Sequence, residues 1–510
     1  MCIKGEAVPS NQPMIMFFFL LLVSLSAFLA ARQFLKSKKL PPGPLAFPLI
    51  GNLPQLGYVL WKTGGVVPML DHYRKQYGDV FTLWLGPIPH VNITDYEISH
   101  EVFVKNASKY ADKHIPPIFE YVRHGQGLFF ANGDSWQELR RFSMLTMRNF
   151  GMGKDLMEEK IMEELNARCV EVDAAAKDGV SCTNANEFFD LTVGSIINCM
   201  LMGFRFDERT KERYLKFKHM LDAAMEQFSP FDLTLPAWIL ERFFPKSFQS
   251  LVTDQLEILD YVSEDAVRRA REYMNGDYEI DVESVEDVVD AFLVKMKQDP
   301  KSDVYNETML KHLVLDLWIA GQETTTTTLV SGFVQMLNYP KVMLKVREEL
   351  LKVTDGGARQ LSLKDKNSTP YFTATLAEIQ RHASILNVNF WRINHEPTVI
   401  GGHPVDSGAL VCAQLSALHT SDKIFERPEQ FEPERFLKDE KLMQQLIPFG
   451  IGKRSCLGEA LARAELFLII GNLLLRYEFR PHGKVPSTRD VLPFSNAKRC
   501  EVFDMDFVKI

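Results

Sequence analysis

A cysteine in a glycine-rich loop is the residue best suited to chemistry in this sequence. Cys456 belongs to the run Phe449–Gly458, which contains glycines at 450, 452 and 458 and leads directly into an apolar helical segment. A cysteine at the start of a helix lies in the positive field of the helix N-terminus, which favours the thiolate. The glycines let backbone N–H groups approach the sulfur, and Arg454 adds positive charge. Such a thiolate could ligate iron, although a buried structural cysteine is an equal alternative from these residues alone.

A run of threonines follows a glycine in the middle of a long helical segment. The run begins Ala320–Thr325, and threonine occupies every position from 324 to 328. Glycine in a helix centre costs about 1 kcal/mol relative to alanine, and a threonine hydroxyl can bond back to the i−4 carbonyl and bend the helix. We therefore expect the helix to open locally, leaving room for dioxygen and a proton-carrying water. A half-buried helix face is the plainer interpretation of threonines alone.

Two further pairs of residues have helical spacing. Glu378 and Arg381 lie one turn apart, and such a pair stabilises an exposed helix by only a few tenths of a kcal/mol. Trp136 and Arg140, at positions i and i+4, put an indole donor and a guanidinium on one helix face, where both could bind an anion. Neither pair identifies a function alone. The order in which these pairs, the threonine run and the cysteine loop follow one another along the chain is more specific.

In that order, the motifs resemble those of the cytochrome P450 family. The family's haem-binding signature, FxxGxRxCxG, is matched at Phe449, Gly452, Arg454, Cys456 and Gly458. The resemblance implies that Cys456 is the axial ligand of the iron in haem b. It also implies that Phe449, Arg454 and Gly458 contribute to the haem site, with Arg454 at a propionate.

The resemblance assigns roles to the other motifs. The family's oxygen-activation motif (small residue, Gly, any residue, acid, Thr) matches at Glu323 and Thr324, an acid–alcohol pair that would deliver the two protons needed to split dioxygen. The thiolate pushes electron density from the opposite side. Glu378, Arg381 and Arg435 resemble the family's buried triad, which serves folding and haem retention.

Residues that bind the propionates and the substrate are also implied. Trp136 and Arg140 resemble the propionate-binding helix, and Arg392 lies where relatives carry Arg or His for the same purpose. The expected pocket residues are Ile118, Phe119, Phe228, Phe231, Trp318, Ala320, Val388, Phe390 and Phe494. Asn387 and Trp391 stand where prolines are expected in the animal microsomal drug- and lipid-metabolising group, which leaves the pocket shape and the substrate open.

Size and composition are those of a large folded protein. The chain has 510 residues, of which 46% are hydrophobic and 24% charged, so a packed core is expected. The formal net charge of −8 argues against nucleic acid as the principal partner. The seven cysteines are scattered without CxxC spacing, which fits a reducing compartment.

Helical periodicity dominates the chain and defines the elements that must position these motifs. Residues 80–85 and 90–94, separated by Gly86-Pro87, predict a small sheet. An apolar connection from Phe228 to Pro245 is broken by prolines. The predicted helices cover residues 135–147, 155–173, 252–274, 282–298, 310–337, 342–353, 373–382 and 458–477. The expected fold is mainly α with a small β lobe, as in the cytochrome P450 fold.

The N-terminal segment has the features of a membrane anchor. Residues 14–31 carry no charge, which meets the short end of the roughly 17 to 25 residues of a spanning helix and exceeds the apolar region of a cleaved signal. Cations at 32, 36, 38 and 39 keep the remaining chain cytosolic by the positive-inside rule. The expected organisation is a lumenal segment (1–13), one transmembrane helix (14–31), a basic, proline-rich hinge (32–44) and the haem domain (45–510), in the endoplasmic reticulum membrane. The sequons at Asn92, Asn106, Asn306 and Asn367 are then expected to be bare.

The implied reaction inserts one atom of dioxygen into a lipophilic xenobiotic, fatty acid or steroid, while the other leaves as water. Because no dinucleotide-binding fingerprint is found, electrons are expected from NADPH through a flavoprotein, NADPH-cytochrome P450 reductase, with cytochrome b5 as a candidate second donor. Arg141, Lys154 and Lys453 are candidate docking charges. Two alternatives remain: a reductase-independent haem-thiolate isomerase or dehydratase, which the intact Glu323–Thr324 pair disfavours, and a haem-binding sensor without turnover.

Overall fold

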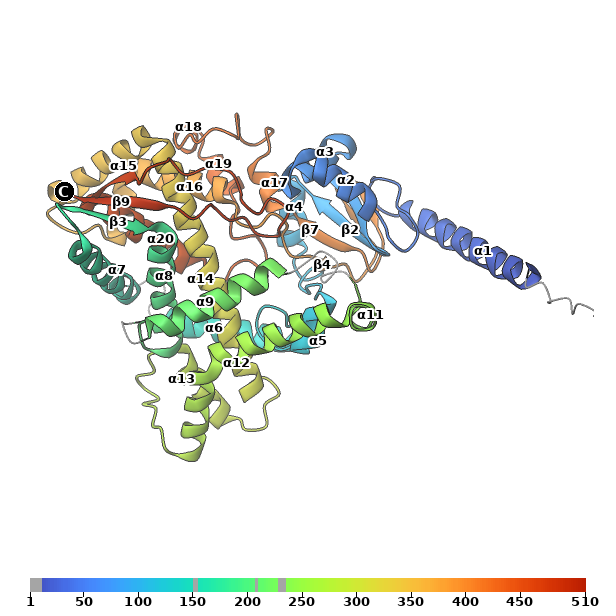
Figure 1. Cartoon of the computed structure of the whole chain (residues 1–510), viewed down its shortest axis with the longest axis horizontal. Helices are drawn as coiled ribbons and strands as arrows, with labels where there is room; N and C mark the ends of the chain where they lie inside the picture. The colour runs from blue at the N-terminus through green and yellow to red at the C-terminus, as the bar shows by residue number, and fades with distance from the viewer. Residues whose placement is uncertain (1–11, 150–154, 207–209, 228–234) are drawn as a thin grey trace, which may run out of the picture.

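The computed structural model describes residues 12–149, 155–206, 210–227 and 235–510, and helices dominate it (Figure 1). This mainly helical architecture with small sheets confirms the predicted fold class. The long helices that the periodicity predicted are α6 (Gly133–Asn149), α7 (Asp155–Ala175), α12 (Pro245–Asn275), α13 (Val288–Gln298), α14 (Glu307–Asn338), α15 (Pro340–Val353), α16 (Pro370–Ala383) and α20 (Glu459–Arg476). Helix α13 begins six residues later than predicted because Asp287 caps it, accepting a hydrogen bond from the backbone of Asp290 at 2.8 Å.

Several helices were not predicted. Four of them are long: α2 (Leu53–Thr63), α3 (Val66–Tyr77), α8 (Ala185–Met202) and α9 (Lys211–Gln227). Helix α8 is buried on nearly every side, so it lacks the polar stripe by which an amphipathic helix is recognised. The shorter helices are α4 (Tyr96–His100), α5 (Pro117–Arg123), α11 (Ala237–Phe243), α17 (Leu415–His419), α18 (Arg435–Lys438) and α19 (Lys441–Gln445). Helix α11 lies in the proline-broken connection, of which residues 228–234 are outside the described part of the chain.

The sheets join segments that are distant in sequence. The predicted hairpin is confirmed: β1 (Val80–Leu85) pairs antiparallel with β2 (Ile88–Ile93). Strand β7 (Leu410–Ala413) continues this sheet parallel to β2, and β4 (Arg392–Ile393) pairs antiparallel with β7. A second sheet has the order β3 (Val180–Asn184), β9 (Asp504–Lys509) and β8 (Tyr477–Pro481), and a separate ribbon pairs β5 (Thr398–Ile400) with β6 (His403–Val405).

Helix α14 runs through the centre of the protein and packs against α8, α12, α16 and α20 (Figure 1). Gly321 lies at its close approach to α8, where a Cβ atom would be 2.4 Å from the Ile197 side chain. The expected local opening of this helix is wrong, because α14 is continuous from Glu307 to Asn338. The Thr324 hydroxyl does donate back to the carbonyl of Ala320, at 2.7 Å, but within an unbroken helix.

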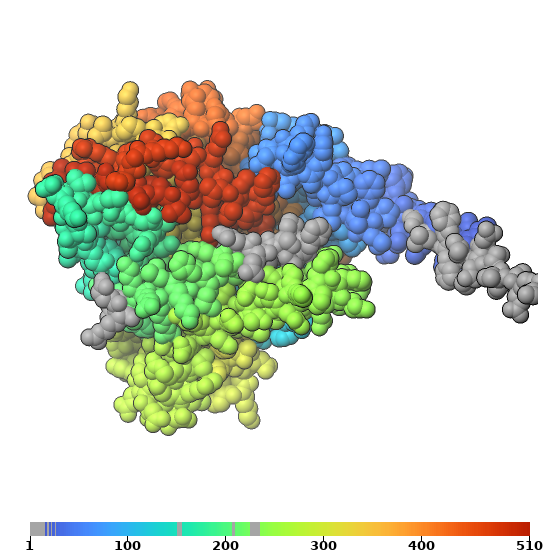
Figure 2. All heavy atoms as spheres, viewed as in Figure 1, coloured from blue at the N-terminus to red at the C-terminus, as the bar shows by residue number. Residues whose placement is uncertain are grey.

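The expected anchor segment lies within α1 (Gln12–Ser37), which extends away from the rest of the protein (Figures 1 and 2). Large apolar side chains along it are exposed, among them Phe17, Leu21 and Phe28. Over the residues that the structure describes, no helix combines the length and the apolar content needed to cross a membrane.

The three residues of the expected triad come together in the interior. Arg381 donates to Glu378 through Nε (2.8 Å) and Nη2 (2.9 Å), and Arg435 Nε donates to the same carboxylate at 3.1 Å. Burial alone would raise the pKa of Glu378, but the bonds from Arg381 and His382 outweigh it and lower this pKa to about 2. The triad connects α16 to the segment that begins α18.

We predict that Glu378→Gln lowers the free energy of unfolding by about 3–5 kcal/mol, because it leaves two buried guanidinium groups without their counter-charge. Urea denaturation followed by circular dichroism measures it, with Glu272→Gln as the control. Glu272 pairs with Arg268 on a helix surface, where such a pair is worth below about 1 kcal/mol. The difference in unfolding free energy between the two variants should have its full size above pH 4.5 and disappear as the pH falls towards 2. The reason is that the pKa of Glu378 is lower in the folded protein than in the unfolded chain. Equal losses for the two variants would contradict this account.

Candidate functional site

The Cys456 loop has a fixed main-chain conformation ahead of α20. The Cys456 amide donates to the carbonyl of Phe449 at 2.8 Å, which closes the loop. Gly452 has φ +80°, and a Cβ atom there would lie 1.9 Å from the carbonyl oxygen of Phe103, so only glycine fits. At Gly458, which precedes α20, an added Cβ atom would meet no atom within 4 Å. The loop is thus tightly packed at Gly452 and faces open space at Gly458.

The pKa of the Cys456 thiol results from opposing effects. Burial raises its pKa, and this outweighs the backbone hydrogen bond from Gly458 and the positive charges of Arg140 and Lys113. A metal ion that binds a thiol removes its proton outright. The loop therefore offers a sulfur ligand whose ionisation depends on the metal.

Four cationic side chains gather beside this loop. Arg454 donates to the carbonyls of Ala111 (2.7 Å) and Ala131 (2.9 Å), and its guanidinium lies 3.6 Å from the centre of the Trp136 ring. Arg140, on α6, donates to the carbonyl of Ser455 at 2.9 Å. The other two cations are Arg392 on β4 and Lys113, whose backbone forms a bridge with that of Arg392.

Lys113 and Arg392 are buried and Arg140 and Arg454 are half-buried. Asp112 acts on Arg454 and Asp316 on Lys113, but among the described residues none of the four cations forms an ion pair with a carboxylate. Burial lowers the pKa of Arg454 to about 9 and that of Arg392 to about 10, and it lowers the pKa of Lys113 well below its usual value. Among the described residues, Nη1 of Arg392 and Nη1 of Arg454 are buried and have no hydrogen-bond partner. A bound anion would satisfy guanidinium donors of this kind with charge-assisted hydrogen bonds. The two propionates of a haem, with its iron at Cys456, fit this donor set.

Lys113 was missed by sequence reasoning. It is 7% exposed, its ammonium group donates to the carbonyl of Phe129 at 3.2 Å, and it lies 3.6 Å from the centre of the Phe129 ring. No motif or spacing marks this lysine in the sequence. Its place at the site follows from the backbone bridge to Arg392, which joins segments almost 280 residues apart.

Glu323 lies in a cluster of charges that the sequence did not reveal. Lys218 of α9 donates to Glu323 at 2.6 Å, and Arg499 lies 3.6 Å from the second carboxylate oxygen. Burial alone would lower the pKa of Lys218, but the carboxylates of Glu323, Asp190 and Asp222 outweigh it and raise this pKa. Burial also raises the pKa of Asp190 to about 7. A carboxyl that changes protonation near neutral pH therefore lies beside the lysine that pairs with Glu323.

The predicted pocket residues divide into two groups. Ala320 is exposed although residues 312–318 of the same helix are buried, so α14 borders open space there. Phe119 stacks on Phe130 with ring centres 4.6 Å apart, and Phe390 meets Phe129 edge to face at the same distance. Phe129 and Phe390 lie next to Lys113, and Phe130 joins the two ring pairs by meeting Phe129 edge to face.

The remaining pocket residues lie elsewhere. Trp318 is 2% exposed and packs on Phe217 in the core, and Ile118 is fully buried against Leu240. Phe494 is 56% exposed on the surface, and Val388 packs against the cluster formed by α2 and α3. These four positions are better described as core or surface because their contacts are made within the protein or with solvent. Phe228 and Phe231 lie outside the described residues.

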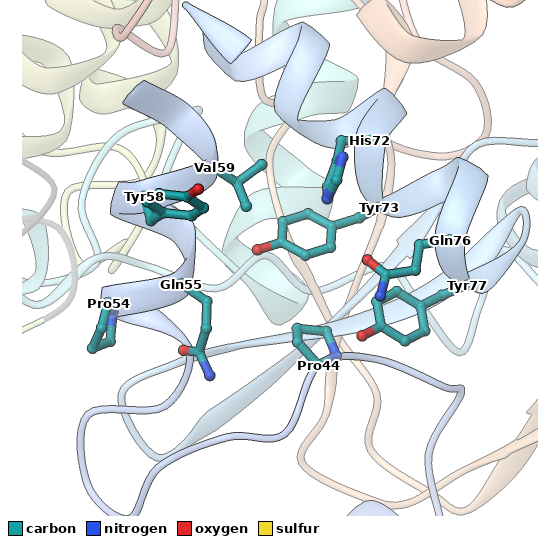
Figure 3. Close-up of a pocket in the computed structure, with 9 residues that line it drawn as sticks. All are labelled: Pro44, Pro54, Gln55, Tyr58, Val59, His72, Tyr73, Gln76 and Tyr77. Atoms are coloured by element: carbon teal, nitrogen blue, oxygen red, sulfur yellow. The ribbon is translucent and has the colours of Figure 1, made fainter. Parts of the chain in front are cut away.

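A hollow of about 430 Å³ lies between α2 and α3, apart from the predicted site (Figure 3). Tyr58, Tyr73 and Tyr77 line it, together with Gln55 and Pro44. None of its residues belongs to the motifs described above. The hollow therefore does not account for the chemistry of the Cys456 loop.

Comparison with known proteins connects this geometry to a family. A model of the family described as cytochrome P450 matches residues 41–498. The chain is 46% identical over 501 residues to the probable cytochrome P450 cyp-35D1 of Caenorhabditis elegans, a match that covers 97% of this chain and 100% of that protein. It is 31% identical over 469 residues to cytochrome P450 2J5 of Mus musculus (90% of each chain) and 32% identical over 490 residues to cytochrome P450 2B2 of Rattus norvegicus (94% of this chain, 96% of that protein). The chain therefore belongs to the cytochrome P450 family and is a haem monooxygenase that uses dioxygen.

Proposed function

We propose that Cys456 is the axial ligand of the haem iron and that Arg140, Arg392, Arg454 and Lys113 hold the haem propionates. The observation that carries this proposal is the meeting of a thiol with two buried and two half-buried cations, none of which forms an ion pair with a carboxylate among the described residues. Haem, when bound, would supply the redox chemistry by which dioxygen is reduced. The Trp136 ring supports the Arg454 guanidinium and so fixes the direction of its free Nη1 donor.

Glu323 and Thr324 move protons to the dioxygen site in this proposal. The Thr324 hydroxyl is held by the carbonyl of Ala320 and is half-exposed, next to the exposed Ala320 side chain. The Glu323 carboxylate is held by Lys218 and Arg499 and must exchange those partners to pass a proton on. A positioned acid of this kind contributes about 100-fold or more to a proton-transfer step.

We propose a lipophilic small molecule as the substrate, oxidised by hydroxylation or epoxidation. The rings of Phe119 and Phe390, with those of Phe129 and Phe130, support an apolar substrate because together they offer a stretch of aromatic surface. The full-length protein, reconstituted with reductase, NADPH and an apolar substrate under ¹⁸O₂, should incorporate one labelled oxygen atom per product. A rearranged product without NADPH would instead support an isomerase, and binding without NADPH oxidation a sensor.

Thr324→Val should uncouple this reaction, because it removes the hydroxyl and preserves the shape of the side chain. We expect the product formed per NADPH to fall roughly 100-fold while peroxide rises. Thr328→Val is the matched control, since Thr328 lies one turn later and makes the same back-bond, to the carbonyl of Thr324 at 2.8 Å. Unchanged coupling in Thr324→Val, or an equal loss in both variants, would contradict the assigned role.

We propose that an NADPH-dependent reductase, with cytochrome b5 as a candidate second donor, docks near the Cys456 loop. Lys453 in this loop and Arg141 on α6 are both exposed, which supports an electrostatic docking surface. Lys154 lies outside the described residues.

Lys453→Glu should slow reductase-supported turnover about tenfold at low ionic strength, and the difference should shrink as salt screens the charge. Turnover driven by added peroxide, which needs no reductase, should stay unchanged. Lys177→Glu, which reverses an exposed charge beside β3, is the control. A loss of the same size in both assays would place the defect in the haem site instead of the docking surface.

We propose that α1 attaches the protein to the endoplasmic reticulum membrane, with residues 45–510 on the cytosolic side. The exposed apolar side chains of α1, followed by Lys38 and Lys39, support this orientation. Asn92 is 1% exposed and bonded to Gln414, which agrees with an unmodified sequon.

Removal of residues 1–37 should move the protein from carbonate-washed membranes to the supernatant, because it deletes the whole apolar helix. The haem absorption of the released protein serves as the folding control. A truncated, haem-containing protein that stays fully with the membranes would show that α1 is not the attachment.

A further inference from the structure

Three side chains of different chemistry meet on the second sheet, away from the haem site. Cys182 of β3 and Asp506 of β9 are direct cross-strand partners, and His482 follows the end of β8. Nδ1 of His482 lies 2.9 Å from Oδ1 of Asp506. The sulfur, an imidazole nitrogen and a carboxylate oxygen all lie within 4.8 Å of one another.

The main chain fixes these positions. Strand β9 lies beside β3 (Figure 1) and pairs with β8 on its other side, so the three ligand-bearing segments share one sheet. The His482 amide donates to the carbonyl of Asp504 at 3.2 Å, which extends the pairing past the end of β8. A site built on paired strands is more precise than one built on loops.

We propose that Cys182, His482 and Asp506 bind a zinc ion. Thiolate, imidazole and carboxylate are the ligands that Zn²⁺ takes in proteins, and three protein ligands leave a fourth tetrahedral position for water. The trio is open to solvent: Cys182 is exposed, and the side chains of His482 and Asp506 are 56% and 24% exposed. An ion can therefore enter without rearrangement of the fold.

The surrounding charges favour a cation. Asp504 lies two residues before Asp506 on β9. Its cross-strand partner is Asn184 of β3, whose side-chain amide donates a hydrogen bond to the Asp504 carboxylate. Arg480 of β8 is the direct cross-strand partner of Asp506, and its guanidinium is paired with Glu478 at 3.0 Å. The local balance is negative, and a bound zinc ion would offset it while linking β3, β9 and the end of β8.

Zinc binding to the full-length, haem-containing protein tests the proposal. Equilibrium dialysis against Zn²⁺, on protein without a polyhistidine tag, should give one bound ion that Mg²⁺ at the same concentration does not displace, because a thiolate ligand disfavours magnesium. Cys182→Ser, His482→Ala and Asp506→Asn should each weaken binding about tenfold or more, since each removes one of three ligands. In the wild type, zinc should also protect Cys182 from iodoacetamide, read by peptide mass spectrometry.

A matched control exists elsewhere on the surface. His395 and Asp112 form a similar exposed pair, with Nε2 3.0 Å from Oδ2, so His395→Ala should leave zinc affinity unchanged. An unchanged haem spectrum verifies that each variant is folded. The proposal is overturned if the protein retains no zinc, or if zinc binds equally well to all three ligand variants.

Discussion

Buried positive charge beside the Cys456 loop is the constraint on which the rest of the structure depends. Arg140, Arg392, Arg454 and Lys113 come from four separate parts of the chain, and the hydrogen bonds described for them end on carbonyl and amide oxygens. Burying an unpaired ion costs roughly several kcal/mol, so an anion beside the buried Lys113 and Arg392 and the half-buried Arg140 and Arg454 would offset that cost. Because haem brings two carboxylates and an iron that ionises the Cys456 thiol, its binding and the folding of this region are coupled in our proposal.

Helix α14 carries the second predicted part of the site, the Glu323–Thr324 pair. Its close packing on α8 at Gly321 fixes its position, and its continuous backbone holds Thr324 and Glu323 in adjacent positions. The Thr324 hydroxyl keeps a local partner, whereas Glu323 is drawn to Lys218 and Arg499 from distant segments. The acid–alcohol pair thus combines a residue held by its own helix with one held by tertiary ion pairs.

Sequence reasoning was strongest where a local pattern carries its own physics. The periodicity of α6, α14 and α20 gave these helices to within a few residues, and the Gly86-Pro87 turn gave the β1–β2 hairpin. The prediction failed at α8, which is buried on nearly every side and so lacks a polar stripe, and at α14, which stays helical past its glycine and threonines.

The candidate site divides along the same line. The loop of Cys456 and the spacing of Trp136 with Arg140 are local, so they could be read directly. Lys113 reaches the site through its backbone bridge to Arg392, and Lys218 through its ion pair with Glu323. No sequence spacing predicts either contact. The thiol pKa was predicted from the helix end, the loop glycines and Arg454, whereas burial also acts on it and raises it. Such effects depend on what surrounds a group in three dimensions.

The most direct test of the central claim is the carbon monoxide difference spectrum of the dithionite-reduced protein, compared with that of Cys456→Ala. We predict the strongly red-shifted Soret band of thiolate-ligated haem in the wild type and its absence in the variant. Cys199→Ala, which changes a half-buried cysteine on α8, should keep the band and serves as the control. A band of the same position and strength in Cys456→Ala, or none in folded, haem-supplied wild type, would contradict the assignment of Cys456 as the iron ligand.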